Sequence, residues 1–154
     1  IGINLEGAVK GKKIQDIELE NICKKIKKKH IDAQIILLSA PEKFKKVIQL
    51  QEKMNLTYVV SSYKPNTIQD IAALIKNLDL IITPDTSISH ISSTFQKPII
   101  TIHENNQDSY KLFAPTSHLN RTVFSKSKNS LNGFSSDLLL KYCFELIDLI
   151  KKKI

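Results

Sequence analysis

The chain has 154 residues, of which 42% are hydrophobic and 25% charged, the proportions of an ordinary globular domain. No apolar run approaches the roughly 20 residues that cross a bilayer, and no secretory signal is recognisable, so membrane-spanning and exported classes are not expected. Cys23 and Cys143 lack metal-ligand spacing and are predicted to be buried thiols in a reducing compartment. Because the chain opens on an apolar run without methionine, we expect it to be a piece of a longer protein.

The formal net charge is +8, and lysines cluster at 24–29 and 151–153. Such clusters favour acidic partners, such as phospholipid head groups, nucleic acid or phosphorylated substrates. Equally, lysines in the last turn of a helix complement its dipole and stay solvated. Aromatic residues make up only 6% and are not interleaved with the basic runs, and no helix-turn-helix, RNP or zinc pattern occurs. Sequence-specific nucleic-acid binding is therefore not expected.

Strand and helix patterns alternate along the chain. Short apolar runs predict strands at 1–5, 33–38, 57–60, 80–83, 98–103 and 121–124. Helical spacing predicts helices at 15–30, at 41–54, from Thr67, from Ser87, and in a final segment that ends near Lys152. The first helix is predicted to bury Ile17, Ile22, Cys23 and Ile26. Residues 104–119 read as irregular with one helical turn near 109–112, and His30 and His118 as surface residues.

This alternation predicts the fold class: an α/β, Rossmann-like, doubly wound parallel sheet with right-handed crossovers and helices on both faces. Neither a repeat nor a linker divides the sequence, so residues 1–154 are expected to form one domain. No GxGxxG follows the first strand, and no GxxxxGK[ST] occurs, which argues against dehydrogenase and P-loop functions.

The most informative segment follows the strand at 80–83. Pro84 stops the strand, and Asp85, Thr86 and Ser87 are all good helix N-cap residues, with His90 one turn further on. The carboxyl end of a buried strand and the positive start of a helix together make a site for an anion such as phosphate. The simpler alternative is that Asp85 or Thr86 only caps the helix and His90 is an ordinary helix residue. His103, which ends the next strand, either lines the same cleft or merely terminates that strand.

Four features carry a resemblance to a known family: a helix start at 67–72, Asp-Thr-Ser at 85–87, His90, and Lys-Pro at 97–98. Together they resemble the C-terminal domain of the ADP-heptose:lipopolysaccharide heptosyltransferases, glycosyltransferase family nine. The likeness extends more weakly to the segment 3–8, to Ala-Pro at 114–115 and to the loop at 37–42.

The resemblance assigns expected roles to single residues. A lysine after the first strand would approach the donor phosphate, and Lys12 is the best match, with Lys13 adjacent. Glu42 would meet the adenosine ribose. Backbone N–H groups of Thr86 and Ser87 and the His90 side chain would stabilise charge on the diphosphate. Asp85 would contact sugar hydroxyls or loop amides, because it would repel phosphate.

For the whole chain, the resemblance implies the donor-binding domain of a GT-B glycosyltransferase, in which an acceptor hydroxyl attacks the anomeric carbon of ADP-heptose. The donor is the only small molecule expected, with no cofactor and no metal. The catalytic base and the binding of the lipopolysaccharide or lipooligosaccharide core acceptor would belong to a missing N-terminal domain. The enzyme would be cytoplasmic, with peripheral contact to the inner face of the bacterial inner membrane. Two alternatives are a related enzyme with another nucleotide sugar, and a non-catalytic nucleotide-binding or interaction module.

Overall fold

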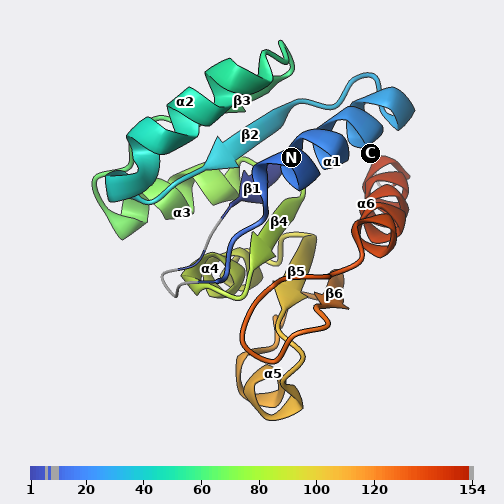
Figure 1. Ribbon diagram of the computed structural model, residues 1–154. Helices are drawn as coiled ribbons and strands as arrows, with labels where there is room; N and C mark the ends of the chain where they lie inside the picture. Colours follow the sequence, from blue (N-terminus) through green and yellow to red (C-terminus); the bar gives the residue numbers. More distant parts are fainter. Residues whose placement is uncertain (6, 8–10, 153–154) are drawn as a thin grey trace.

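The fold is built on six parallel strands. The computed structural model describes residues 1–5, 7 and 11–152 (Figure 1). The strands lie in the sheet in the order β3-β2-β1-β4-β5-β6. Their bounds are β1 Gly2–Asn4, β2 Ile35–Leu38, β3 Val59–Ser61, β4 Ile81–Pro84, β5 Ile99–His103 and β6 Asn120–Phe124. The sequence-based prediction of a parallel, doubly wound sheet is confirmed.

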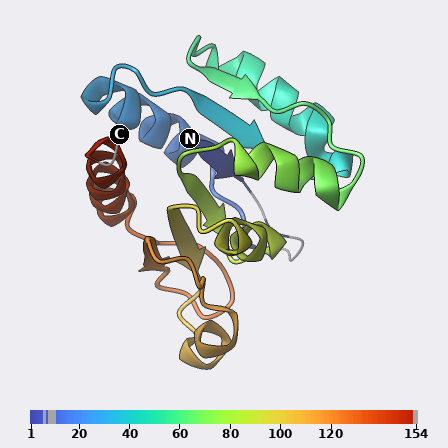
Figure 2. The same ribbon diagram turned by 180° about the vertical axis from the view of Figure 1, so that it is seen from behind.

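Helices cover both faces of this sheet (Figures 1 and 2). They are α1 Asp16–Lys29, α2 Phe44–Met54 after the short 3-10 turn η1 Pro41–Lys43, α3 Ile68–Lys76, α4 Ser87–Thr94, α5 Gln107–Phe113 and α6 Ser136–Lys151. One apolar cluster packs α1, α2 and α6 against the sheet, and a second packs α3 and α4. α5 follows the carboxyl end of β5 and lies beyond the sheet at the bottom of Figure 1.

The strand order reverses direction between β1 and β4. Ile3 of β1 is paired in register with Leu37 of β2 on one side and with Ile82 of β4 on the other. The connections after β1 and β2 run toward one edge, and the connections after β4 and β5 toward the other. In open α/β sheets, a crevice forms outside the carboxyl ends of the strands at such a switch point. In this chain it lies at the ends of β1 and β4.

Side-chain caps fix the starts of the two helices that border this crevice. Thr67 and Asp70 form a capping box at α3: the Thr67 hydroxyl accepts from the Asp70 N–H at 3.2 Å, and the Asp70 carboxylate accepts from the Thr67 N–H at 2.9 Å. Thr86 is the N-cap of α4, and its Oγ1 accepts from the Ile88 N–H at 3.2 Å. The predicted helix starts at Thr67 and Ser87 therefore agree with the structure.

Two single-residue predictions were wrong. Ile17 is 78% exposed, because the apolar stripe of α1 runs through Leu19, Ile22, Cys23 and Ile26, and Ile17 lies outside this 3.6-residue spacing. His30 is buried rather than on the surface: its ring lies 5.6 Å from that of Phe144 in α6.

Other expectations needed smaller adjustments or none. The third strand starts two residues later than predicted, and the helical turn expected near 109–112 is the longer helix α5. Both cysteines are free and buried as predicted, and burial raises the pKa of each thiol to about 12. Among the helices in the described part of the chain, none is long and apolar enough to cross a bilayer.

Candidate functional site

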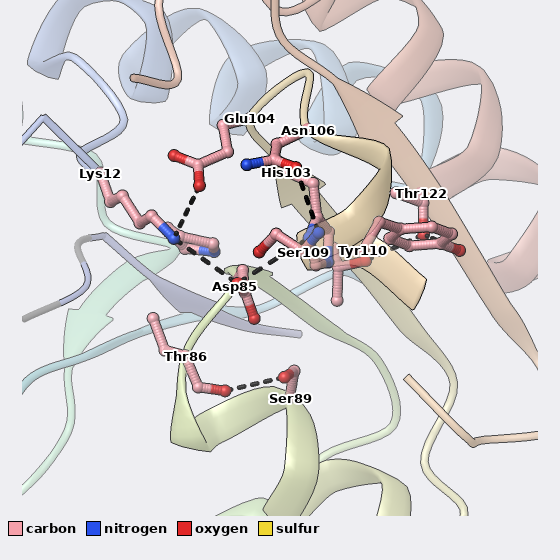
Figure 3. A network of polar contacts seen from close by, with 12 residues as sticks. Lys12, Asp85, Thr86, Ser89, His103, Glu104, Asn106, Ser109, Tyr110 and Thr122 are labelled. Atoms are coloured by element: carbon pink, nitrogen blue, oxygen red, sulfur yellow. Dashed lines mark hydrogen bonds and ion pairs between the residues drawn. The ribbon is translucent and has the colours of Figure 1, made fainter. Parts of the chain in front are cut away.

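The start of α4 stands at the switch point, directly after β4. Thr86 caps the helix, and its carbonyl oxygen accepts a 2.7 Å hydrogen bond from the Ser89 hydroxyl (Figure 3). Ser87, the first helical residue, is exposed at this turn. The N–H groups of a first helical turn carry the positive end of the helix dipole. The structure thus puts Thr86 and Ser87 where an anionic ligand is favoured.

A buried polar network holds this helix start against the first strand. The side-chain amide of Asn4 donates to Thr83 Oγ1 at 3.0 Å and to Thr86 Oγ1 at 3.3 Å. The two threonine hydroxyls lie 3.2 Å apart, and the Thr83 hydroxyl donates to the Pro84 carbonyl at 2.8 Å. The sequence analysis did not single out Asn4. The only available signal was a polar residue at the end of a short apolar strand.

Beside the helix start, one lysine meets two carboxylates. Lys12 Nζ lies 3.5 Å from Asp85 Oδ2 and 3.7 Å from Glu104 Oε1, as Figure 3 shows. These side chains are only 13%, 13% and 16% exposed, so water screens the interactions weakly. The three residues come from the β1–α1 connection and the carboxyl ends of β4 and β5. Lys13, the alternative lysine, instead pairs with Asp16 at 2.9 Å.

His103 forms the inner wall of this group. It is 2% exposed, and its Nδ1 points toward Asp85 Oδ2 across 3.9 Å, too far for a hydrogen bond (Figure 3). Its ring packs edge-on against Tyr110, with centroids 5.0 Å apart, and Nε2 has no hydrogen-bond partner among the described residues. Burial lowers the pKa of His103, Asp85 opposes that shift and Lys12 adds to it, so the net effect disfavours the charged ring. His103 therefore does more than end its strand: it contacts the site.

Gly7 lets the first connection approach α4 closely. A Cβ at this position would lie 3.1 Å from Thr86 Cγ2 and 3.4 Å from Lys12 Cβ. The Gly7 N–H donates to the Lys12 carbonyl at 2.8 Å, which holds Lys12 beside Gly7 and near Asp85.

A cleft of about 440 Å³ opens on the β2 side of the α4 start. It is lined by the ends of β1 and β2, the turn η1, and the first residues of α3 and α4. Glu42, Thr86 and Ser87 are among the lining residues, with the apolar side chains of Ile68 and Ile88. Glu42 is exposed on η1 and belongs to this cleft, not to the cluster around Lys12.

Five of the six predicted site residues thus fall into three groups. Asp85 and Lys12 lie together beside the helix start, Thr86 and Ser87 form the start itself, and Glu42 lines the cleft. His90 is separate: it is exposed on α4, and its ring faces Phe113 of α5 at 6.4 Å.

Glu104 was missed by the sequence analysis. The signal available for it was its position directly after a predicted strand, next to His103. Within residues 1–5, 7 and 11–152, no group of three or more His, Cys, Asp or Glu side chains is arranged to hold a metal ion.

Solved structures share this fold. An E. coli ADP-heptose LPS heptosyltransferase II aligns with 99% of this chain and 47% of its own, at a TM-score of 0.80 and 14% identity. The E. coli heptosyltransferase WaaC with ADP aligns with 94% of this chain over 43% of its own length, at a TM-score of 0.77 and 16% sequence identity. A family 9 glycosyl transferase from Veillonella parvula aligns with 94% of this chain over 45% of its own length, at a TM-score of 0.75 and 15% sequence identity. The chain spans less than half the length of each of these structures.

Sequence comparison gives the family itself. Among curated proteins, no sequence matches this chain significantly. The sequence profile described as glycosyltransferase family 9 (heptosyltransferase) matches residues 20–142, which run from within α1 to within the first half of α6. This match extends over more than half of the chain and contains the switch-point helix α4 with Asp85 and Glu104, whereas Lys12 lies before the matched residues. The chain therefore belongs to glycosyltransferase family 9, the heptosyltransferases.

Proposed function

We propose that this chain is the donor-binding domain of a heptosyltransferase that transfers heptose from ADP-heptose to a lipopolysaccharide or lipooligosaccharide core acceptor. The observation that carries the proposal is the start of α4 at the switch point, with Lys12 on one side and the cleft of about 440 Å³ on the other. Membership of family 9 and the ADP in the solved E. coli WaaC structure support it. The acceptor site and the catalytic base would lie in a domain outside this sequence.

In the proposed complex, the nucleoside occupies the cleft and the diphosphate meets the first turn of α4. The cleft combines apolar side chains for the base with the Glu42 carboxylate, an acceptor for ribose hydroxyls. The N–H groups of Thr86 and Ser87 and the Lys12 ammonium would bind the phosphates. His90, on the second turn of the same helix, would add a donor.

The chemistry follows from this charge distribution. The acceptor hydroxyl gives its proton to the catalytic base of the other domain and attacks the anomeric carbon, the bond between that carbon and the diphosphate breaks, and the electron pair leaves with ADP. Negative charge therefore grows on the diphosphate in the transition state. Fixed donors that face this charge lower the barrier, because they are oriented before the reaction starts. Lys12 and the α4 amides would have this role.

The first experiment is a calorimetric titration of the chain with ADP, UDP and GDP side by side. We expect selective binding of ADP and no sugar transfer by this chain alone. Selective binding of UDP or GDP would favour a family member with another nucleotide-sugar donor. Binding of none of the three would contradict the donor-site proposal and favour an interaction module.

We also propose peripheral contact with anionic lipid on the cytoplasmic face of the bacterial inner membrane. A groove of about 690 Å³ between α1 and α6 is lined by four lysines, Lys25, Lys28, Lys29 and Lys141, and by the carboxylates of Asp137, Glu145 and Asp148. The three carboxylates, of which Asp137 pairs with Lys25 at 3.0 Å, leave the groove with an excess of one positive charge. Each lysine near an anionic surface contributes about 1 kcal/mol. The chain should sediment with phosphatidylglycerol vesicles and not with phosphatidylcholine vesicles, and equal sedimentation with both would contradict lipid contact by charge.

A further inference from the structure

Glu104 is the residue of the cluster that the proposed donor site does not yet explain. It directly follows β5, one strand further from the cleft than Asp85, and its side chain is 16% exposed. Both carboxylates are directed toward the same ammonium, that of Lys12, at 3.5 and 3.7 Å (Figure 3). A carboxylate is rarely buried to this extent unless it is paired or has a ligand.

Charge decides what these carboxylates can bind. The Lys12 ammonium offsets only one of the two negative charges, and burial of the neighbouring His103 disfavours a positive charge on its ring. A phosphate placed against the Asp85 and Glu104 carboxylates, and not against the Lys12 ammonium, would be repelled by the remaining negative charge. Neutral hydroxyl groups are suitable partners, because a carboxylate has only acceptor positions and each hydroxyl donates one hydrogen bond.

The order of the strands gives the direction of the ligand. The cleft lies toward β1 and β2, the α4 start follows β4, and Glu104 follows β5. A nucleotide sugar with its nucleoside in the cleft and its diphosphate at α4 would continue toward β5. The next chemical group of such a ligand is the sugar, which carries hydroxyl donors and no charge.

A second feature of the same place points to an absent polar partner. His103, which is 2% exposed, directs Nδ1 into the cluster without reaching hydrogen-bond distance from Asp85. Its Nε2 also lacks a partner within the described part of the chain. Nε2 points away from Nδ1 on the ring, so the atom that bears on the cluster is Nδ1. Buried polar groups in proteins are normally hydrogen-bonded, and Nδ1, which faces the cluster without a partner at hydrogen-bond distance among the residues that the structure describes, leaves a position for a ligand or water.

We propose that Glu104 is a specificity-determining residue of the donor site. Its carboxylate, together with that of Asp85, accepts hydrogen bonds from hydroxyl groups of the transferred sugar. The site thereby binds the nucleotide sugar more tightly than the nucleotide alone. This inference rests on the proposed donor-binding function and adds to it the residue that recognises the sugar.

The test compares ADP with ADP-heptose in calorimetric titrations of the chain and of the variants Glu104→Gln and Glu104→Ala. The decisive quantity is the ratio of the two dissociation constants. We expect Glu104→Ala to lower the preference for ADP-heptose about tenfold or more, because hydrogen bonds to a charged group are lost. The affinity for ADP should stay the same or rise, because a negative charge near the diphosphate is removed. The preference of Glu104→Gln for ADP-heptose over ADP should lie between those of the wild type and Glu104→Ala.

Asp108→Asn is the matched control, because it removes one carboxylate charge from exposed α5 close by in sequence. In this variant, the ratio of the dissociation constants for ADP and ADP-heptose should equal that of the wild type. If Glu104→Ala weakens ADP and ADP-heptose equally, Glu104 only holds Lys12 in place and the inference is overturned. If the wild-type chain binds neither compound, the donor-binding function itself is overturned.

Discussion

The side-chain amide of Asn4 donates a 3.0 Å hydrogen bond to Thr83 Oγ1 and thereby ties the end of β1 to the end of β4. The same amide lies 3.3 Å from Thr86 Oγ1, the N-cap hydroxyl of α4. One buried side chain thus connects the two strands of the switch point and the helix start that the proposed site uses. The position of the candidate phosphate-binding turn is therefore coupled to the stability of the sheet.

Asn4→Ala should destabilise the chain by about 1–3 kcal/mol, because Thr83 and Thr86 lose a donor at a buried position. Unfolding in urea measures this loss. Asn132→Ala, in an exposed loop, is the control and should shift the midpoint little. Equal midpoints for the two variants would mean that the network contributes nothing to folding.

Much of the architecture could be predicted from sequence, because its causes are local. The strand at Ile81–Pro84, the Thr86 cap and the start of α4 at Ser87 follow from β-branched residues, a proline and capping side chains in direct succession. The burial of His30 could not be predicted in this way. It depends on the ring of Phe144, more than a hundred residues further along the chain.

The same distinction applies to the site. The resemblance pointed to Lys12 and Asp85, but only the fold reveals that they meet, because they are far apart in sequence and come from two sides of the switch point. Asn4 and Glu104 were missed because a polar residue at or after the end of a short strand is common. Its role can be recognised only from the residues that the fold places beside it. Ile17 was wrongly assigned to the core because an apolar residue near a helix start lies on the buried stripe only if the helical phase is right.

Lys12→Ala should weaken ADP binding by roughly tenfold or more, because a charge-assisted contact with phosphate is lost. Lys13→Ala is the matched control: Lys13 is the adjacent lysine, but it pairs with Asp16 on the surface. Titration calorimetry with ADP compares the two variants, and circular dichroism checks that both are folded. Equal weakening in both variants would indicate a general effect of charge and would argue against a specific role for Lys12.

His90→Ala should weaken ADP binding while changing the free energy of unfolding by less than about 0.5 kcal/mol, because the side chain is exposed. The control is His118→Ala, which removes another exposed histidine outside the proposed site. Titration with ADP and urea unfolding of both variants give the comparison. An ADP affinity that is unchanged in His90→Ala would remove His90 from the proposed site. The phosphate donors would then be the N–H groups of the α4 start and the Lys12 ammonium.

His103 should make the folded chain less stable as the pH falls. Burial lowers the pKa of His103 in the folded state, whereas the unfolded chain takes up the proton near pH 6.5. Below about pH 6.5 the unfolded state therefore binds more protons, and stability decreases until the folded-state pKa is reached. The pKa of His30 is lowered by burial and by Lys151, so His30 also makes the folded chain less stable as the pH falls.

His103→Phe isolates the contribution of His103, because a phenyl ring can pack against Tyr110 and Phe124 as the imidazole does. Urea unfolding between pH 5 and pH 7 should show a shallower loss of stability in this variant, by at most about 1.4 kcal/mol per pH unit. The exposed control His118→Phe should keep the wild-type slope. A steeper loss in His103→Phe would mean that attraction by Asp85 outweighs burial, so that His103 is charged when the chain is folded.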